Sequence, residues 1–313
     1  MTKTTNFSLN AVTMDLPSYI LNCPFSINNN NPNNIWMNED DEPINVEVAV
    51  SQWMDLYQFL GSNGFVQNLP TPIGSDLQDL TYVANLGIVL THLNGEKPVV
   101  IIANFTSEPR YDETKIGVDF FKNAGYEVHV CPFKFEGEAE LKHIKDNLYI
   151  GGYGQRTDIQ AFEWMEEHFG MKIIKVEMRS LKTYHFDCLC FPITTKDILL
   201  CKSLCSKEEV AEIEAEGINI IDVPLEFAES GVTNNVRVGN LVLNSSDIYE
   251  LDRTDDAEDW HLENDKNEWL IDTLLNLGME PVFVNLSELT KSGAMLSCCV
   301  MHANRASYNI DYI

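Results

Sequence analysis

The sequence predicts an α/β fold, a ring of five repeated strand–helix–strand units in one domain. Segments with helical periodicity alternate along the chain with apolar segments of strand length. A glycine follows each predicted helix, as is expected where a helix ends in a left-handed residue. The same order of helix, glycine and strand recurs in four stretches: FFKNAGYEVHVCPF, WMEEHFGMKIIKVEM, EIEAEGINIIDVPL and LLNLGMEPVFVNL. Four complete repeats, preceded by one partial repeat, indicate five units.

The partial unit lies in the N-terminal part of the chain. We expect residues 1–18 to form a flexible arm and residues 19–313 to form the folded domain. The asparagine-rich segment 20–34 cannot cover a hydrophobic core, so it is predicted to be a loop. Apolar residues then recur at three- and four-residue steps over residues 45–60 and predict a helix that glycines terminate.

Each complete unit is predicted as a strand, a helix and a second strand. The first has apolar hairpin strands at 81–91, then a strand at 99–103, a helix at 112–123 and a strand at 127–132. The other three are predicted at 147–151, 158–168 and 172–178; at 197–201, 207–214 and 219–223; and at 236–243, 268–277 and 281–284. An acidic insert at about 244–266 lacks the spacing of an EF-hand loop, so we interpret it as a solvated surface excursion.

Composition excludes several classes of partner. The chain has 48 acidic and 21 basic residues and a formal net charge of −27, whereas a nucleic-acid backbone requires clustered Lys and Arg. No uncharged window has the length of a membrane span, and the N-terminus lacks the apolar run of a secretory signal, so we expect a cytoplasmic protein. The eight cysteines do not have zinc-site spacing and are interpreted as reduced thiols. No metal or cofactor is expected, and an oligomer is left open.

Several polar residues fall where predicted strands end or turn. In a ring of repeats the equivalent strand ends converge near the axis, so these side chains are expected to share one cavity. They are Asp79, Asn85, Arg110, Glu136, Arg156, His185, Asp187, Asn234 and Cys298. Together they would place a thiol, an imidazole, carboxylates, guanidiniums and amides around a small ligand.

Each of these residues also has a simpler interpretation. A histidine on an apolar strand, such as His185, is more often a core residue than a catalyst. Glu136 would ordinarily belong to a solvated turn, and Arg110 and Arg156 to the surface. Cys298, next to Cys299, would ordinarily be a small buried hydrophobe. The functional interpretation depends on all of them occurring together in one order.

That order resembles the pentein (amidinotransferase-fold) superfamily of guanidine-modifying enzymes. The superfamily includes arginine deiminase, dimethylarginine dimethylaminohydrolase and arginine dihydrolase. The resembling motifs occur in family order from about residue 20 to about residue 300: LNCPFSINNNNPNNIWM, DLTYVANLGIV, FKFEGEAEL, GGYGQRT, YHFDCLCFP and KSGAMLSCC. The resemblance implies a five-bladed α/β propeller around a central active site, and a small guanidino substrate, either arginine or a methylated arginine.

The resemblance also implies a role for each matched residue. Cys298 corresponds to the nucleophile, His185 to the general acid/base and Glu136 to the third catalytic residue. The residues matched to substrate binding are Asn34, Asp79, Asn85, Arg110, Arg156, Asp187 and Asn234, with Asp187 on the guanidinium and the two arginines near the carboxylate.

The chain departs from the family pattern after Glu136. The family turn usually continues with a second glycine and an aspartate, whereas this chain has Glu138, Ala139 and Glu140. We expect Glu138 to add bulk and charge near the site, and Glu140 to reach one methylene further than aspartate. The nucleophile turn is also less rich in glycine, with Ala294 and Met295. These changes leave open a guanidine-binding protein that has lost turnover.

Among the activities of the family, Asn85 favours arginine dihydrolase, which releases ornithine, ammonia and carbon dioxide. An ionised aspartate only accepts hydrogen bonds, whereas an amide also donates and therefore suits both a guanidinium and a neutral ureido intermediate. The enzymatic alternative is deimination or dimethylaminohydrolysis that stops at citrulline.

Overall fold

Five three-stranded sheets form the ring in the computed structural model, which describes residues 16–37, 42–93, 95–254 and 257–308. In each sheet the middle strand pairs antiparallel with one neighbour and parallel with the other. The antiparallel neighbours, called here the first strands, are β3 (Gly87–Val89), β6 (Leu141–Lys145), β9 (Cys190–Pro192), β12 (Val236–Val238) and β15 (Met301–His302). The middle strands are β1 (Ser18–Leu21), β4 (Val99–Ile102), β7 (Leu148–Tyr153), β10 (Asp197–Leu200) and β13 (Leu241–Ser245).

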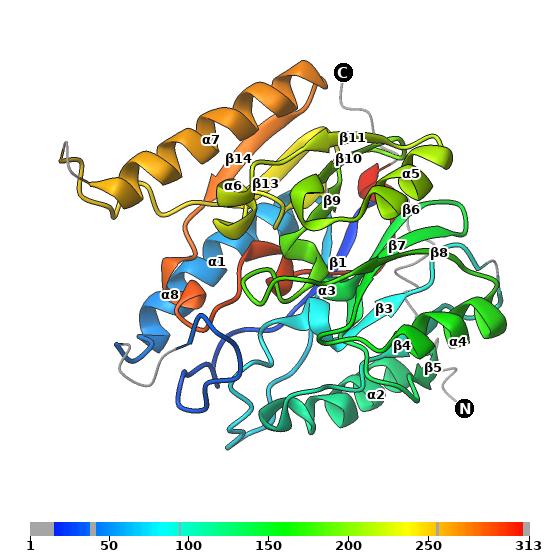
Figure 1. Cartoon of the computed structure of the whole chain (residues 1–313). Helices are drawn as coiled ribbons and strands as arrows, with labels where there is room; N and C mark the ends of the chain where they lie inside the picture. The colour runs from blue at the N-terminus through cyan, green and yellow to red at the C-terminus, as the bar shows by residue number, and fades with distance from the viewer. Residues whose placement is uncertain (1–15, 38–41, 94, 255–256, 309–313) are drawn as a thin grey trace.

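A helix connects each middle strand to the parallel third strand of the same sheet. The third strands are β2 (Phe65–Asn68), β5 (Glu127–Val130), β8 (Lys172–Glu177), β11 (Asn219–Asp222) and β14 (Glu280–Val284). The connecting helices are α1 (Val46–Asn63), α2 (Glu113–Asn123), α4 (Ile159–Phe169), α5 (Lys207–Ala215) and α7 (Glu258–Asn276). Figure 1 shows these five helices at the periphery of the molecule, with the short helix α3 (Gly137–Glu140) near the middle.

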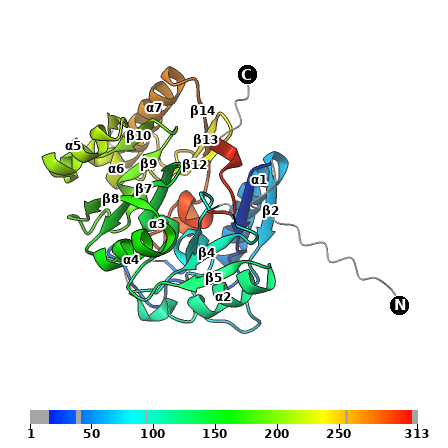
Figure 2. The ribbon, with the colours of Figure 1, turned by 90° about the vertical axis from the view of Figure 1, so that its right-hand side faces the viewer.

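The ring closes through strands from the two ends of the chain. Strand β15 pairs antiparallel with β1, with Tyr19 opposite His302 and Ile20 opposite Met301. In Figure 2 the red C-terminal segment accordingly lies beside the blue β1. One hydrophobic cluster, which includes Leu56 and Leu296, packs the first sheet and α1 against the last sheet. Burial of apolar side chains between adjacent units therefore holds the blades together.

Local sequence explains the helix ends. Ser206 and Glu209 form a capping box at the start of α5, and the Asn45 side chain accepts hydrogen bonds from the first backbone amides of α1. The glycines predicted to stop the four repeat helices have left-handed φ angles of 89° at Gly125, 64° at Gly170, 73° at Gly217 and 72° at Gly278. The predicted stop at Gly61 was wrong, because α1 continues to Asn63. The five-bladed α/β architecture predicted from the repeats is confirmed.

Several predicted elements were wrong in detail. Each unit has a first strand that the two-strand repeat did not include. The predicted strand 236–243 is a hairpin of β12 and β13 that turns at Gly239, where φ is 65°. The region 81–91, predicted as hairpin strands, contains only β3, preceded by the 3₁₀ helix η2 (Val83–Leu86). Local patterns missed these strands because they are short and depend on pairing with their neighbours.

The acidic insert is shorter than the predicted range of 244–266. Residues Asn244 and Ser245 belong to β13, and α7 begins at Glu258 rather than at residue 268. Within α7 the buried Lys266 ammonium lies 2.7 Å from Glu263 Oε1. At the other end of the chain, Ser18 is buried in β1 and not part of an arm, whereas residues 1–15 lie outside the described residues. No helix in the described ranges is long and apolar enough to cross a membrane.

Candidate active site

The turn directly before each first strand carries a predicted site residue. Asn85 lies in η2 before β3, and Glu136 directly precedes α3, which leads into β6. Asp187 lies in the 3₁₀ helix η4 (Phe186–Cys188) before β9, and Asn234 precedes β12. Cys298 lies in the 3₁₀ helix η6 (Leu296–Cys299) before β15. Equivalent positions in the five units therefore supply the polar groups that surround the axis.

Glycine permits the close packing of these turns at two points. Gly137 has a φ of 63°, and a Cβ there would lie 2.3 Å from the Ala84 carbonyl oxygen. Gly293 has a φ of 76°, and its Cβ would lie 2.2 Å from Asn34 Oδ1. Neither position accepts a side chain, so α3 can contact η2, and the segment before η6 can contact the N-terminal loop.

The Cys298 thiol is buried beside a carboxylate. Its Sγ lies 3.5 Å from Asp187 Oδ2 and 3.8 Å from Asn234 Nδ2. The Ser297 hydroxyl also donates to Asp187 Oδ2, at 2.7 Å. Burial, together with the negative charge of Asp187, raises the pKa of Cys298 to about 12, so the free protein holds a protonated thiol at neutral pH. Cys299 does not line the cavity, and its Sγ contacts the Met295 carbonyl oxygen.

The imidazole of His185 is held between a carboxylate and an amide. Its Nε2 lies 2.8 Å from Glu136 Oε2, and Asn85 Nδ2 lies 3.4 Å from Nδ1. Burial lowers the pKa of His185 although the Glu136 carboxylate opposes this, so the neutral ring donates Nε2–H to Glu136. Burial would raise the pKa of Glu136, but the hydrogen bond from His185 and the nearby charges of Arg156 and Arg110 together outweigh it and lower that pKa to about 2. Glu136 is therefore ionised, and its Oε1 accepts a further bond from Thr106 N at 3.0 Å.

The two glutamates that depart from the family pattern point to different places. Glu140 Oε1 lies 4.0 Å from His185 Nε2, and Glu140 Oε2 accepts a hydrogen bond from Phe186 N. Burial, with the negative charges of Glu136 and Asp187, raises the pKa of Glu140 well above its usual value. The expectation that Glu138 adds charge near the site was wrong. Its carboxylate accepts hydrogen bonds from His302 N and Nδ1 at 3.0 and 2.8 Å, and it lines a different cavity.

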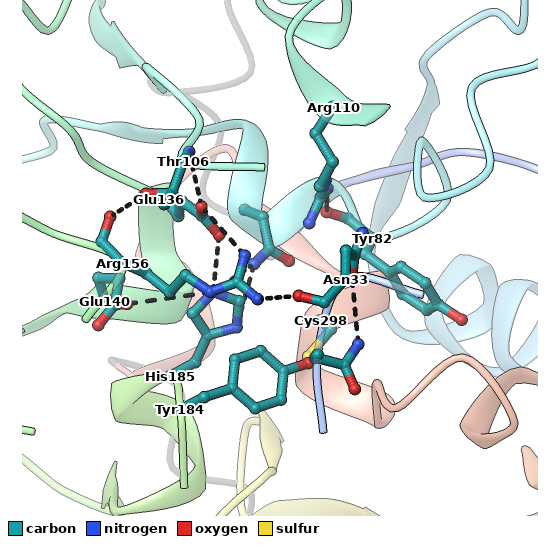
Figure 3. Close-up of polar contacts among 12 residues, drawn as sticks. Asn33, Tyr82, Thr106, Arg110, Glu136, Glu140, Arg156, Tyr184, His185 and Cys298 are labelled. Atoms are coloured by element: carbon teal, nitrogen blue, oxygen red, sulfur yellow. Dashed lines mark hydrogen bonds and ion pairs between the residues drawn. The ribbon is translucent and has the colours of Figure 1, made fainter. Parts of the chain in front are cut away.

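The two predicted arginines have different surroundings. Arg156 Nη1 lies 3.5 Å from Glu136 Oε1, and Nη2 donates to the Asn33 carbonyl oxygen at 2.5 Å. Figure 3 shows its guanidinium beside His185 and Asn33. The guanidinium of Arg110 is already hydrogen-bonded to another side chain, because its Nε and Nη2 donate to Glu113 at 3.0 and 2.8 Å. Its Nη2 also contacts the carbonyl oxygens of residues 79 and 82, so Arg110 braces the segment that precedes η2.

The predicted residues meet around one cavity. Those that line it are Asn34, Asp79, Asn85, Arg110, Arg156, His185 and Cys298. Glu136 and Asp187 lie behind His185 and Cys298, and Asn234 lines an adjoining cavity of about 150 Å³ that also reaches Cys298. All ten predicted residues are thus brought together. In the described part of the chain, no group of three or more His, Cys, Asp or Glu side chains could hold a metal ion.

Sequence reasoning missed several residues of this cavity. The Asn33 amide donates to Asp79 Oδ2 at 2.6 Å, and Ser292 accepts a hydrogen bond from Asn34 through its carbonyl oxygen at 3.0 Å. Tyr184 donates to the Gly293 carbonyl oxygen at 2.8 Å and forms a wall beneath Arg156. Asn33 and Tyr184 are sequence neighbours of the matched Asn34 and His185, and that adjacency was the one available signal.

The arrangement has the parts needed for substitution at a guanidinium carbon. It combines a thiol, an imidazole that can move a proton, and carboxylates that can hold a planar cation in bidentate fashion. Binding of a cation beside Asp187 would also offset the negative charge that raises the Cys298 pKa. The site can therefore couple ligand binding to formation of the thiolate.

Comparisons with known proteins agree with this geometry. The family described as N,N dimethylarginine dimethylhydrolase, eukaryotic, matches residues 22–305. A Mycobacterium tuberculosis protein named N(G),N(G)-dimethylarginine dimethylaminohydrolase is 24% identical over 272 residues, which cover 86% of this chain and 80% of that protein. The bifunctional arginine dihydrolase/ornithine cyclodeaminase AgrE of Nostoc sp. is 23% identical over 86% of this chain, but this chain spans only 35% of its length.

Solved structures of similar proteins have the same fold. The substrate-bound N-terminal domain of ArgZ, an arginine dihydrolase from the ornithine–ammonia cycle in cyanobacteria, superposes with a TM-score of 0.78 at 20% identity. The match covers 92% of this chain and 98% of that domain. Because the family match extends over most of its length, the chain belongs to the N,N-dimethylarginine dimethylhydrolase family, a group of pentein-fold hydrolases that act on the carbon–nitrogen bonds of guanidino compounds.

Proposed function

We propose that this protein is an arginine dihydrolase that uses Cys298 as its nucleophile. The observation that carries the proposal is the Asn85 side chain. Its amide Nδ2 contacts His185, and its Oδ1 is buried without a hydrogen-bond partner in the described structure. The amide lines the same cavity as Cys298. A side chain that both donates and accepts at this position suits a cationic guanidinium and a neutral ureido group alike.

The substrate is held by opposite charges at its two ends. The Asp187 carboxylate, which lies 3.5 Å from the thiol, binds the guanidinium and fixes its plane next to Cys298. Arg156 also lines the cavity, and a guanidinium there matches an α-carboxylate. Arg110 plays a lesser part in this proposal, because Glu113 already occupies two of its nitrogens.

In the first hydrolysis His185 moves each proton. As the guanidinium binds, Cys298 passes its proton to the neutral His185, and the thiolate forms a carbon–sulfur bond to the guanidinium carbon. His185 donates a proton to one nitrogen, which leaves as ammonia when its carbon–nitrogen bond breaks. His185 then takes a proton from water, which attacks the same carbon and releases the thiolate. The product at this point is citrulline.

A second round on the ureido group completes the reaction. The thiolate attacks the ureido carbon, ammonia leaves, and hydrolysis of the remaining carbamoyl group releases ornithine and carbon dioxide. In total, arginine and two waters give ornithine, two molecules of ammonia and carbon dioxide. The neutral ureido group is held less strongly than the guanidinium by Asp187, so the donor of Asn85 is needed to retain it.

Dimethylarginine dimethylaminohydrolysis is the second candidate. It is favoured by the family match and by the cavity of about 150 Å³ that adjoins the thiol. Small residues such as Ala228 and Gly231 line that cavity together with Met295, and they leave space for methyl groups on a guanidinium nitrogen. In that case the reaction would end at citrulline and release dimethylamine.

Product analysis distinguishes the two candidates. Purified protein is mixed with arginine or with dimethylarginine, and ornithine, citrulline, ammonia and dimethylamine are followed over time. We expect ornithine from arginine in the natural protein. Asn85→Asp should still consume arginine but accumulate citrulline, because loss of one donor costs about 1–3 kcal/mol and lets release of citrulline outrun the second attack.

The exposed Asn30 offers a matched control, since Asn30→Asp makes the same chemical change away from the cavity. It should leave the ratio of ornithine to citrulline unchanged. If the natural protein makes only citrulline from either substrate, Asn85 does not select the outcome and the dihydrolase proposal fails.

A further inference from the structure

We propose that the ring binds a small organic carboxylate at a second site, in a cavity separate from the one that contains Cys298. This cavity is called here the back chamber. Residues of the first strands β3, β6, β9 and β15 line it, so it lies on the axis of the ring. Glu138 lines the back chamber, whereas the neighbouring Glu136 bonds to His185 of the active-site cavity. The proposal does not depend on which reaction occurs at Cys298.

Lys142 is the first indication of an anionic ligand. This half-buried residue of β6 lines the back chamber, and its ammonium has no hydrogen bond or ion pair with any residue in the described ranges. The buried Lys266, by contrast, lies 2.7 Å from Glu263. A partly desolvated ammonium is unfavourable unless an anion or water compensates it, so Lys142 is a cation available to a ligand.

Two further groups line the chamber. The Arg305 guanidinium packs on the Tyr308 ring and donates to the His143 carbonyl oxygen, and it forms no ion pair with a carboxylate of the described residues. His302 donates Nδ1–H to Glu138 Oε2 at 2.8 Å, while its Nε2 is buried and has no partner among those residues. The Nε2 atom is therefore a polar group available to a ligand or to a water that bridges to it.

The charge balance of the chamber differs from that of the whole molecule. The cations Lys142 and Arg305 face one carboxylate, that of Glu138, in a chain whose formal net charge is −27. Ile88, Phe191 and other apolar side chains line the rest of the chamber. A carboxylate with a short hydrocarbon body matches both features, whereas an inorganic oxyanion matches only the charged part.

Isothermal titration calorimetry with isovalerate tests this assignment on the full chain. We expect saturable binding of one isovalerate per chain, and binding at least about tenfold weaker in Lys142→Met, because a charge-assisted hydrogen bond is lost. Arg156→Met removes the competing cation of the active-site cavity and should leave isovalerate binding unchanged. His302→Phe provides a second variant of the chamber, with the same expected loss, in case Lys142→Met does not fold.

Three results would overturn the proposal. The first is that the natural protein shows no saturable isovalerate binding up to tens of millimolar, and the second is that binding is lost in Arg156→Met and kept in Lys142→Met. Saturable binding of inorganic phosphate without binding of isovalerate would exclude the organic carboxylate. Circular dichroism of each variant confirms that a loss of binding does not reflect unfolding.

Discussion

Two glutamate–histidine pairs lie close together in the sequence and face different cavities. Glu136 lies 2.8 Å from His185, and Glu138 lies 2.8 Å from His302. The first pair is almost fully buried, with exposed side-chain fractions of 0% and 4%, whereas each side chain of the second pair is 12% exposed. The first pair has the Cys298 thiol in its cavity, and the second has Lys142 and Arg305.

The comparison shows that a short carboxylate–imidazole bond does not by itself indicate catalysis. The two bonds are equal in length, but only the first histidine lines a cavity that also contains a thiol. Burial and neighbouring charges then set the protonation of that thiol and that histidine. The other pair faces the back chamber. Among the described residues that line this cavity there is no thiol, and the hydroxyls are those of Thr91, Ser297 and Tyr308.

The largest expected difference between the two cavities lies in the nucleophile. Cys298→Ser should reduce turnover on the order of 10⁴-fold or more, because a serine hydroxyl is a much weaker nucleophile than a thiolate. Cys299→Ser should retain most activity, because that thiol does not line the cavity. Mass spectrometry of enzyme trapped during turnover should place the covalent adduct on Cys298. An adduct on Cys299 would show that the motif match is shifted by one residue.

Exchange of the carboxylate for an amide tests the two pairs directly. Glu136→Gln should lower kcat by about 10²–10⁴-fold, because the ionised partner that orients His185 and supports its protonation is lost. Glu138→Gln removes the same charge from the other pair and should change kcat by less than about threefold, with a loss of stability of about 1 kcal/mol. Steady-state kinetics and thermal unfolding check both effects. Equal losses of kcat would mean that the two pairs are coupled in catalysis.

Alkylation measures the protonation of Cys298 in the free enzyme. With the pKa of Cys298 near 12, the rate of its reaction with neutral iodoacetamide should rise about tenfold per pH unit between pH 7 and pH 10. Asp187→Asn removes the neighbouring negative charge, so it should lower that pKa and increase the rate at pH 8. Peptide mapping assigns the modified cysteine. A rate that is already independent of pH at pH 7 would mean that the free enzyme holds a thiolate.

The sequence predicted the helices, the parallel strands and the ring because their signals are local. Apolar periodicity and the left-handed glycines, such as Gly170 and Gly217, act within one repeat. First strands such as β15 and β9 were missed because two or three residues carry too little pattern and depend on pairing across the sheet. The start of α7 was missed because its first half is acidic, and the Glu263–Lys266 pair is visible only in three dimensions.

The candidate site was also predicted only in part. Motif order identified Cys298, His185 and Glu136, and the equivalent turns bring them together. The direction of Glu138 could not be predicted, because one residue along the short helix α3 decides which cavity the side chain enters. The ion pair between Arg110 and Glu113 could not be predicted either, since an arginine in a motif gives no information about its partner.

The smallest expected effect concerns Glu140, the carboxyl group closest to the Glu136–His185 pair. Its pKa is raised above the usual value, so the folded state binds a proton that the unfolded state releases above its own lower pKa. Stability conferred by this group is therefore greatest below the unfolded pKa of about 4.5 and falls as pH rises toward the folded pKa. Glutamine reproduces the neutral form at every pH and can still accept the hydrogen bond from Phe186 N.

Glu140→Gln should accordingly change kcat at pH 7 by less than about threefold, in contrast to Glu136→Gln. Its melting temperature should equal that of the natural protein near pH 4 and exceed it at pH 8, since glutamine has no proton to lose in the unfolded chain. Calorimetry at the two pH values measures the difference. A variant that is less stable at pH 8, or that loses as much activity as Glu136→Gln, would show that Glu140 is ionised in the folded protein. In that case the carboxylates of Glu136 and Glu140 would share the negative charge and the proton that pair with His185.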